Sequence, residues 1–205
     1  RKDLLSYSEK EIEKILNEIE LNEVKQNSEN KAYIEAIAES VSFYKEGFAT
    51  VNLKIFRNYN HGIQFNILSY VTAQVSGSRK MLRYRNLEPF LKKIDSKIFI
   101  NNNLHNCQLI SDNDQLLIYK EIAKIDKAQS ALTDGLIWDN RFRIHIHDKK
   151  LDGYEISYLT QEMLSVLKKT DKFLEKYKNF DFFCQKKIIF TFPIIKNLEK
   201  LVALP

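Results

Sequence analysis

Glycine, proline and cysteine are scarce in this chain of 205 residues, which contains five, three and two of them respectively. Cys107 and Cys184 belong to no Cys-x-x-Cys pair, so a reduced, cytoplasmic compartment is the simplest interpretation. No apolar run is long enough to cross a membrane and no signal peptide is visible, so we expect no membrane partner. The glycine-rich phosphate loops, GxGxxG and GxxxxGK followed by Ser or Thr, are both missing. The sequence therefore gives no sign of a nucleotide-binding domain of those classes.

The composition is that of a folded chain. Apolar residues make up 44% of the sequence and aromatic residues 12%, which excludes a disordered protein. This length fits one large domain or two small ones. Because the chain begins with Arg1 rather than methionine, we expect a fragment or a processed piece.

Positive charge is unevenly distributed along the sequence. The formal net charge is +5, yet residues 1–46 contain 11 acidic and 7 basic side chains. Within residues 79–97, seven side chains are basic and two are acidic. Such a stretch favours an anionic partner such as nucleic acid, and a merely solvated face is the alternative. The candidate phosphate-binding residues here are Arg79, Lys80, Arg83, Arg85, Lys92 and Lys93.

Apolar residues at helical spacing predict that the first half is mainly helical. Ser8 and Glu11 form a capping box for a first helix. Further helices are expected over about 29–46, after Asn60 up to the break at 76–78, and over about 83–94. Gly47 is placed to end the second helix in a left-handed turn, and residues 48–53 alternate like a short strand. We therefore expect residues 1–98 to form a small helical unit, with a boundary near 97–103.

The second half mixes strands and helices. Residues 104–111 and 115–121 read as two strands around the turn Asp112-Asn113-Asp114. Thr160 can cap a helix that reaches about residue 177. Other expected strands lie at 141–147, 154–159, 188–192 and 198–203. The expected fold class is α+β: an N-terminal helical subdomain followed by a small mixed α/β C-terminal subdomain with antiparallel hairpins.

The segment 141–147 alternates between apolar and polar residues with a period of two. Its polar face is expected to contact phosphates and carries Arg141, Arg143, His145 and His147. Two histidines at this spacing also occur in metal sites, although only Asp139 and Asp148 lie near enough in sequence to add a ligand. We expect a binding surface without metal, and a small metal-dependent hydrolase is the less favoured alternative.

Three other features have a structural and a functional interpretation. Cys107 and His105 have the parts of a thiol–imidazole pair, but no third group orients them, and a small core cysteine is the simpler interpretation. The segment 76–79 has one glycine and follows a helix, which favours a helix–helix turn over a phosphate loop. Trp138 is the only tryptophan and would either anchor a core or stack on a base.

Several short motifs together resemble the C-terminal part of tRNA(Ile)-lysidine synthetase. They are Leu104-His105-Asn106-Cys107, Tyr119-Lys120-Glu121, Trp138-Asp139-Asn140-Arg141-Phe142 and the end of the chain from Phe192-Pro193 to Pro205. The family shows a Gly-Gly-Cys-like strand start, a strand ending in Arg-Glu, then Trp-Asp-Gly-Arg-Phe and a Leu-Pro to Val-Pro closing segment. Here His105, Asn106 and Asn140 replace glycine, and Lys120 replaces arginine. Asparagine tolerates left-handed backbone geometry, so the change at Asn140 is mild.

The resemblance implies a piece that positions tRNA. In that family an N-terminal domain with the loop Ser-Gly-Gly-x-Asp-Ser uses ATP, with Mg, to adenylate the wobble cytidine of an isoleucine tRNA, and lysine then displaces AMP. That loop is missing from this sequence, so the resemblance implies neither a catalytic residue nor a cofactor for this piece. It implies a substrate-binding subdomain over 1–98 and a tRNA-binding subdomain over 99–205, with tRNA and the ATP-pyrophosphatase domain as partners; a homodimer is left open. The alternative is a free-standing protein-interaction or RNA-binding module.

Overall fold

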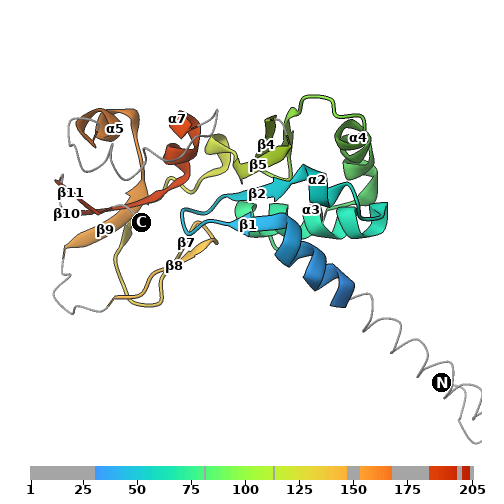
Figure 1. The fold of residues 1–205 in the computed structure, drawn as a ribbon. Coiled ribbons are helices and arrows are strands. Elements are labelled where there is room, and N and C mark those ends of the chain that lie inside the picture. The colour runs from blue at the N-terminus through green and yellow to red at the C-terminus, as the bar shows by residue number, and fades with distance from the viewer. Residues whose placement is uncertain are drawn as a thin grey trace, which may run out of the picture.

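The computed structural model describes residues 31–80, 82–112, 114–146, 153–167, 185–197 and 200–203. Within these ranges the fold is α+β, as the sequence predicted, and every strand pair is antiparallel (Figure 1). No helix in these ranges is long and apolar enough to cross a membrane. The capping box predicted at Ser8 and Glu11 lies outside them.

A five-stranded sheet at the centre of the fold joins the two halves of the sequence. In spatial order its strands are β1 (Val41–Phe43), β2 (Ala49–Asn52), β5 (Gln115–Lys120), β4 (Cys107–Asp112) and β3 (Asn101–Leu104). Strand β2 pairs with β5, and Thr50 lies opposite Leu117. The boundary expected near residues 97–103 therefore runs through a single sheet.

A second sheet and a hairpin complete the strands. The second sheet has the order β11 (Lys200–Ala203), β10 (Pro193–Asn197), β9 (Tyr154–Tyr158) and β6 (Ser130–Ala131). The hairpin consists of β7 (Ile137–Trp138) and β8 (Phe142–Arg143). The helices are residues 31–40, α2 (Leu53–Phe56), α3 (His61–Ser76), α4 (Tyr84–Asp95), α5 (Gln161–Leu167) and α7 (Gln185–Ile188), with the short 3-10 turns η2 (Ile122–Lys124) and η3 (Ile189–Thr191).

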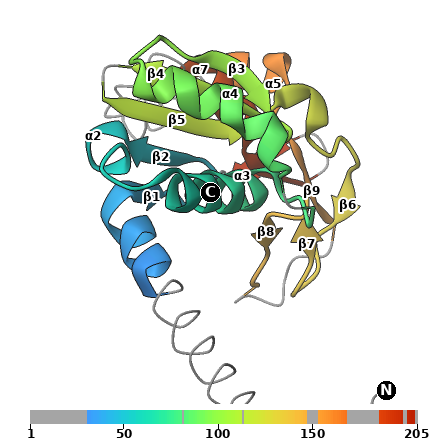
Figure 2. The same cartoon turned by 90° about the vertical axis from the view of Figure 1, so that its right-hand side faces the viewer.

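Side chains alternate along the strands of the central sheet, so the sheet presents apolar side chains on both faces. A separate core covers each face. Leu109 and Ile118 belong to a first core that includes side chains of α3 and α4. Figure 2 shows these two helices lying across the sheet. Ile110 and Leu117 belong to a second core with Leu164 of α5 and side chains of α7. A third core forms around Trp138, under the second sheet and the β7–β8 hairpin.

The local signals for α3 and α4 are confirmed. Helix α3 begins after Asn60, whose side-chain oxygen accepts a hydrogen bond from Ile63 N at 3.0 Å. It ends at Gly77, which has a φ of +70°, the left-handed conformation that glycine adopts without a steric penalty. Helix α4 buries Leu87 and Leu91 with their apolar neighbours and leaves its charged side chains at the surface.

Three element predictions are wrong in their placement. The helix expected over 29–46 ends at residue 40, and Val41–Phe43 forms β1 because the chain turns back at Gly47 into β2. Residues 188–191 are helical, so the strand expected there begins only at Pro193. Among the described residues, the strand expected over 141–147 is limited to Phe142–Arg143. Beyond it, Ile144 bonds to the backbone of Gly135 and Leu136, and Ile146 N donates to the side chain of Asp134.

Candidate nucleic-acid interface and the ion network beside it

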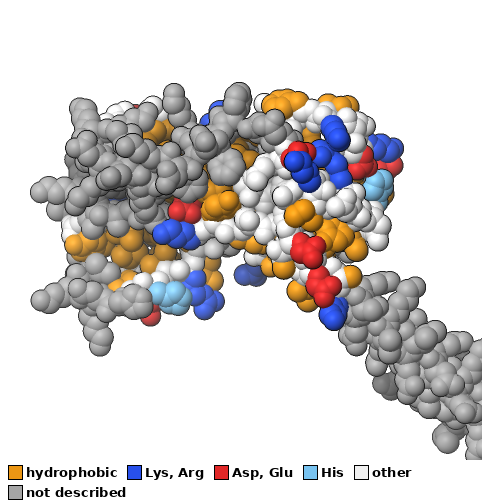
Figure 3. Space-filling model, viewed as in Figure 1, with side chains coloured by type: hydrophobic (Ala, Val, Ile, Leu, Met, Phe, Trp, Pro, Cys, Tyr) orange, Lys and Arg blue, Asp and Glu red, His pale blue; other side chains and the backbone are white. Residues whose placement is uncertain are grey.

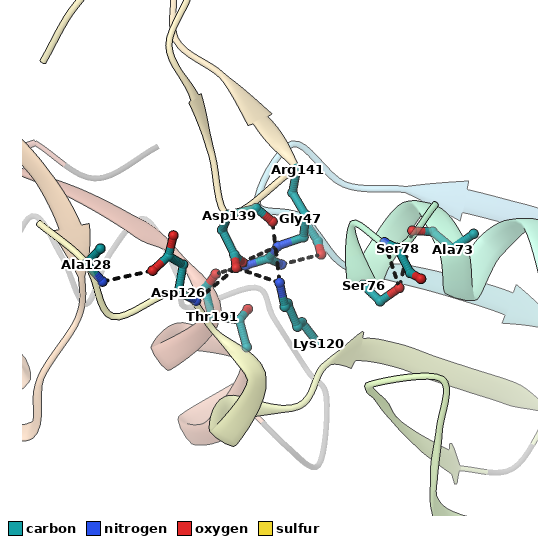
Figure 4. A network of polar contacts seen from close by, with 10 residues as sticks. All are labelled: Gly47, Ala73, Ser76, Ser78, Lys120, Asp126, Ala128, Asp139, Arg141 and Thr191. Atoms are coloured by element: carbon teal, nitrogen blue, oxygen red, sulfur yellow. Dashed lines mark hydrogen bonds and ion pairs between the residues drawn. The ribbon is translucent and has the colours of Figure 1, made fainter. Parts of the chain in front are cut away.

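Asp139 is the centre of a buried network of charged side chains (Figure 4). Its Oδ1 accepts a hydrogen bond from Lys120 Nζ at 2.5 Å, and its Oδ2 accepts one from Arg141 Nε at 2.7 Å. The backbone N–H of Asp126 also donates to Oδ1, at 2.9 Å. The side chains are 2% exposed for Asp139, 2% for Arg141 and 7% for Lys120. Two cations thus share one carboxylate away from water.

Burial lowers the pKa of Lys120 and of Arg141 below their ordinary values, and Asp139 opposes this shift by attraction and hydrogen bonding. The carboxylate is therefore what makes it favourable to keep both cations buried. If Asp139 were neutral, the cost of removing two positive charges from water would remain uncompensated.

Arg141 also connects distant parts of the chain. Its guanidinium donates to the backbone oxygen of Thr191 at 2.8 Å and to that of Gly47 at 3.3 Å. These oxygens belong to η3, which precedes β10, and to the β1–β2 turn of the central sheet, so one side chain links the hairpin to both segments (Figure 4). The expectation that Arg141 lies on a solvent-facing strand is wrong, because its buried guanidinium donates hydrogen bonds to Asp139 and to these backbone oxygens.

The motifs that carry the family resemblance meet at this network. Cys107 lies opposite Lys120 in the β4–β5 ladder, and Glu121 N donates to Asn106 O at 2.8 Å. Lys120 in turn contacts Asp139 of the β7–β8 turn. Motifs that are far apart in the sequence therefore form one structural junction, and only their turn residues Asn106 and Asn140 are exposed.

Positive φ angles explain where this sequence has replaced glycine. The β3–β4 turn consists of His105 and Asn106, with φ angles of 51° and 60°. In the β7–β8 turn, Asp139 and Asn140 have φ angles of 54° and 55°. Two consecutive residues with positive φ are typical of type I′ hairpin turns. The prediction that Asn140 tolerates left-handed geometry is confirmed.

Two glycines allow close packing against the β7–β8 turn. A Cβ atom on Gly77 would lie 2.8 Å from the backbone oxygen of Asp139. A Cβ atom on Gly47 would lie 2.4 Å from Cζ of Phe142. Because ordinary Cβ contacts are longer, a larger residue at Gly77 would displace the backbone of the turn, and one at Gly47 would displace the ring of Phe142. The segment 76–79 thus ends a helix against this turn, which is the structural interpretation expected for it.

His105 and Cys107 are structural residues in this fold. Nδ1 of His105 lies 3.3 Å from Thr72 Oγ1, and Nε2 lies 3.1 Å from Ser78 Oγ. Burial lowers the pKa of His105 below its ordinary value, which favours the neutral ring. The Cys107 thiol is fully buried and donates to the Thr72 backbone oxygen at 3.4 Å. Burial raises its pKa to about 12, so it is a core thiol and not a nucleophile.

The basic residues predicted in 79–93 lie at the surface around α4. Arg79, Lys80, Arg83 and Arg85 are exposed, and in Figure 3 basic side chains gather over α4. Lys92 is 3.0 Å from Glu88 in an exposed ion pair, and Lys93 Nζ donates to Asn102 Oδ1 at 3.2 Å. An exposed ion pair of this kind is worth less than about 1 kcal/mol, so Lys92 can readily exchange its partner for a phosphate.

The second expected surface is smaller than the sequence suggested. Arg143 and His145 are exposed, while Ile144 and Ile146 pack on the third core. The alternation was therefore predicted correctly beyond Arg141. His147 lies outside the described residues. Among the residues that the structure describes, no three His, Cys, Asp or Glu side chains lie close enough together to hold a metal ion.

Trp138 is a core residue, 2% exposed, and packs on Phe142 at a ring-centroid distance of 5.9 Å. Its indole N–H has no hydrogen-bond partner among the described residues. The sequence analysis missed the role of Lys120, although a lysine at the end of a strand of apolar residues was a signal for a buried ion pair. It also missed exposed Ile98 and Phe99, which follow α4.

The comparisons with known proteins agree with the resemblance. The chain is 33% identical over 192 residues to the tRNA(Ile)-lysidine synthase of Rickettsia felis, and 35% identical over 194 residues to that of Rickettsia bellii. Each match covers 93% of this chain, but the chain spans only 44% of the length of each relative. No protein-family model and no solved structure matches it. The resemblance inferred from sequence is thus confirmed: the chain is homologous to less than half of a tRNA(Ile)-lysidine synthase, as expected for its C-terminal part.

Proposed function

We propose that this chain is the tRNA-binding part of a tRNA(Ile)-lysidine synthetase and that it positions tRNA. The observation that carries the proposal is the similarity over 93% of the chain to relatives named for that activity. In the whole enzyme, ATP would be used to ligate lysine to the wobble cytidine of an isoleucine tRNA. The 205 residues of this chain lack the Ser-Gly-Gly-x-Asp-Ser loop expected for the ATP site. Their contribution would be orientation of the substrate, and we expect the protein to act in the cytoplasm.

The surface around α4 supports this role. Its cations are exposed at both ends of a helix whose opposite face is fixed in the first core. Duplex RNA hides its base edges in a deep major groove, so a rigid basic surface recognises it mainly through phosphates and shape. The binding free energy would then come largely from counterion release, which makes affinity strongly dependent on salt concentration.

The test is a salt titration of tRNA binding, measured by fluorescence anisotropy with the complete 205-residue chain. In a quadruple variant, Arg83, Arg85, Lys92 and Lys93 are replaced by alanine. Removing one phosphate contact reduces the slope of log K against log salt concentration by about 0.7–0.9, so a reduction of about 3 is expected if all four residues contact phosphates. A matched control removes four exposed lysines on other elements: Lys31, Lys45, Lys124 and Lys127.

The control separates local contacts from net charge. Both variants lose four positive charges, but only the α4 variant is expected to lose most of the affinity. Equal losses in the two variants would indicate non-specific attraction. Wild-type protein without measurable affinity for tRNA at low salt would contradict the proposal and favour a protein-interaction module.

Arg143 and His145 form the proposed second RNA-facing surface. Replacement of Arg143 by alanine should weaken tRNA binding and leave the free energy of unfolding nearly unchanged, because this side chain is exposed. Replacement of Arg141 should destabilise the fold instead, because its partners are Asp139 and buried backbone oxygens. If Arg143→Ala binds tRNA as tightly as the wild type, this surface has no part in binding.

The chain alone should have no ligase activity. Incubation with ATP, radiolabelled lysine and tRNA is expected to give no more incorporated lysine than a reaction without protein. Incorporation that depends on the chain would show that the ATP chemistry resides within these residues.

A further inference from the structure

Two large apolar side chains are exposed beside the basic residues at the end of α4. Ile98 is 55% exposed and Phe99 is 62% exposed. They lie in the short link between α4 and β3, the last strand in the order of the central sheet. Neither side chain belongs to any of the three cores. A phenylalanine this exposed leaves a large apolar surface in contact with water, which is favourable to cover.

The backbone on both sides of this link is fixed. Lys97 has a φ of 54°, and the N–H of Ile98 donates to Lys93 O at 3.0 Å, as in a Schellman cap. On the other side Ile100 is fully buried, its N–H donates to Ser111 Oγ at 2.7 Å, and its carbonyl accepts from Ser111 N at 2.9 Å. Phe99 therefore stands on a short, anchored segment and would lose little backbone freedom on binding a ligand.

Amide side chains continue the same face of the strand. Asn101 and Asn103 of β3 are exposed and lie opposite Ile110 and Gln108 of β4, on one side of the sheet. Alternation along the extended chain places Phe99 on that side as well, two residues before Asn101. Gln108 Nε2 donates to Asn101 Oδ1 at 2.7 Å, which holds the amide of Asn101 in a defined orientation.

One exposed cation, Lys97, comes two residues before Phe99. Lys93 Nζ contacts Asn102 Oδ1 and connects α4 to β3 on the other side of the sheet, because Asn102 alternates with Asn101 and Asn103. Lys97 is exposed and has no ion-pair partner among the residues that the structure describes. The nearest acidic side chains along the chain have partners: Glu88 pairs with Lys92, and Asp95 lies 2.9 Å from His61 Nε2. Among the described residues, Lys97 is the charged side chain of this link without an ion-pair partner, which favours an anionic ligand over an uncharged apolar peptide.

We propose that Phe99 and the neighbouring amides form a site for an unpaired RNA nucleotide. The base stacks on the Phe99 ring, the amide of Asn101 or Asn103 contacts the base edge, and Lys97 contacts the phosphate. Single-stranded nucleic acid is bound by this combination of an aromatic surface, hydrogen-bonding side chains and a basic border. The site rests on the proposed function, because it assumes RNA as the partner, and it adds contact with an exposed base to the phosphate contacts of α4.

The experiment uses two probes with the complete chain: an isoleucine tRNA transcript, and a short single-stranded RNA that contains 2-aminopurine, whose fluorescence falls when the base stacks on an aromatic ring. Binding of the wild type should quench the probe. Phe99→Ala should weaken oligonucleotide binding about tenfold and abolish the quenching, with an unchanged salt slope. Phe99→Trp should retain both the affinity and the quenching. Lys97→Gln should reduce the slope of log K against log salt concentration by the amount expected for about one phosphate contact.

Ile34→Ala is the matched control, since Ile34 is 64% exposed on the helix of residues 31–40. Thermal melts establish that each variant is folded. If Phe99→Ala binds both probes like the wild type, or if Ile34→Ala is equally impaired, the site is refuted while the proposed function stands. If the wild type does not bind tRNA, both fail. A Phe99→Ala variant with normal RNA affinity but altered sedimentation would identify the surface as a protein contact and overturn the RNA site.

Discussion

Replacing Asp139 with asparagine tests the most consequential interaction in this structure. Asparagine has nearly the same volume as aspartate, so the substitution removes charge without creating a cavity. It leaves Lys120 and Arg141 buried without a counter-charge, and places an NH₂ group where one carboxylate oxygen now accepts a hydrogen bond. Removal of one partner from a buried ion pair typically costs about 3–5 kcal/mol. We expect the free energy of unfolding of Asp139→Asn to fall by about that amount.

The other members of the network should respond differently. Lys120→Met removes one of two cations and leaves Asp139 paired with Arg141, so we expect a loss of about 1.5–3 kcal/mol, the value of a hydrogen bond to a charged group. Combining Lys120→Met with Asp139→Asn should restore part of the stability lost in Asp139→Asn alone, because only one uncompensated cation then remains. This non-additivity distinguishes a charge effect from loss of packing.

Urea unfolding followed by far-UV circular dichroism and by fluorescence measures these differences, since Trp138 is the only tryptophan and is buried beside the network. Asp95→Asn is the control, because its carboxylate is 39% exposed and its partner among the described residues is His61. It should change stability by about 0.5 kcal/mol or less. If Asp139→Asn is destabilised no more than this control, or if the double variant is strictly additive, the charge-compensation argument is refuted.

Three further predictions concern the turns and the buried ionisable groups. Gly77→Ala should cost more than about 2 kcal/mol, because it combines positive φ with a 2.8 Å contact to backbone, whereas Asn140→Gly should change stability by less than about 1 kcal/mol; urea midpoints compare the two. The pKa of His105 is lowered in the fold, so below about pH 6.5 the unfolded chain binds a proton that the folded chain does not, and stability falls as the pH drops. The decrease in Tm from pH 7.5 to pH 5.5 should therefore be smaller in His105→Asn than in the wild type. An equal decrease in both proteins would contradict this. With Cys184 replaced by serine, Cys107 should react with iodoacetamide at pH 8 only in urea, because burial raises its pKa to about 12; fast labelling without urea, measured by mass spectrometry, would contradict its burial.

Local signals in the sequence predicted α3, α4 and the β4–β5 hairpin, because their caps, turns and apolar spacing lie within each element. They did not predict the β2–β5 pairing, which joins segments far apart in the chain, such as Thr50 and Leu117. Local signals also explain why a helix was expected through residue 46, because the spacing of the apolar residues there fits a helix. Instead, Val41 belongs to β1, which pairs with β2, and it packs against the first core. Long-range pairing overrode a local preference there.

The surface cations were easier to predict than the internal ones. The seven basic residues of 79–97 cannot all be buried with an apolar helix face, so exposure follows from composition alone. Arg141 and Arg143 are two residues apart, so the alternation in the sequence predicted that both lie on the same solvent-facing side of a strand. The difference arises because the β7–β8 turn brings Asp139 beside the guanidinium while η3 and the β1–β2 turn supply backbone oxygens. The alternation of apolar and polar residues in the sequence does not predict these long-range contacts.

Three charged residues of the resemblance motifs are separate from the residues proposed to touch RNA. Lys120, Asp139 and Arg141 are all committed to one buried network. Under the proposed function, their substitution would reduce RNA binding by loosening this junction, although their side chains are buried. Residues that contact RNA directly have to be exposed, and those proposed here for that role are the cations around α4, the pair Arg143 and His145, and the surface at Phe99. A binding assay on variants of the motif thus measures folding unless stability is determined alongside it, whereas the exposed residues can be tested by binding alone.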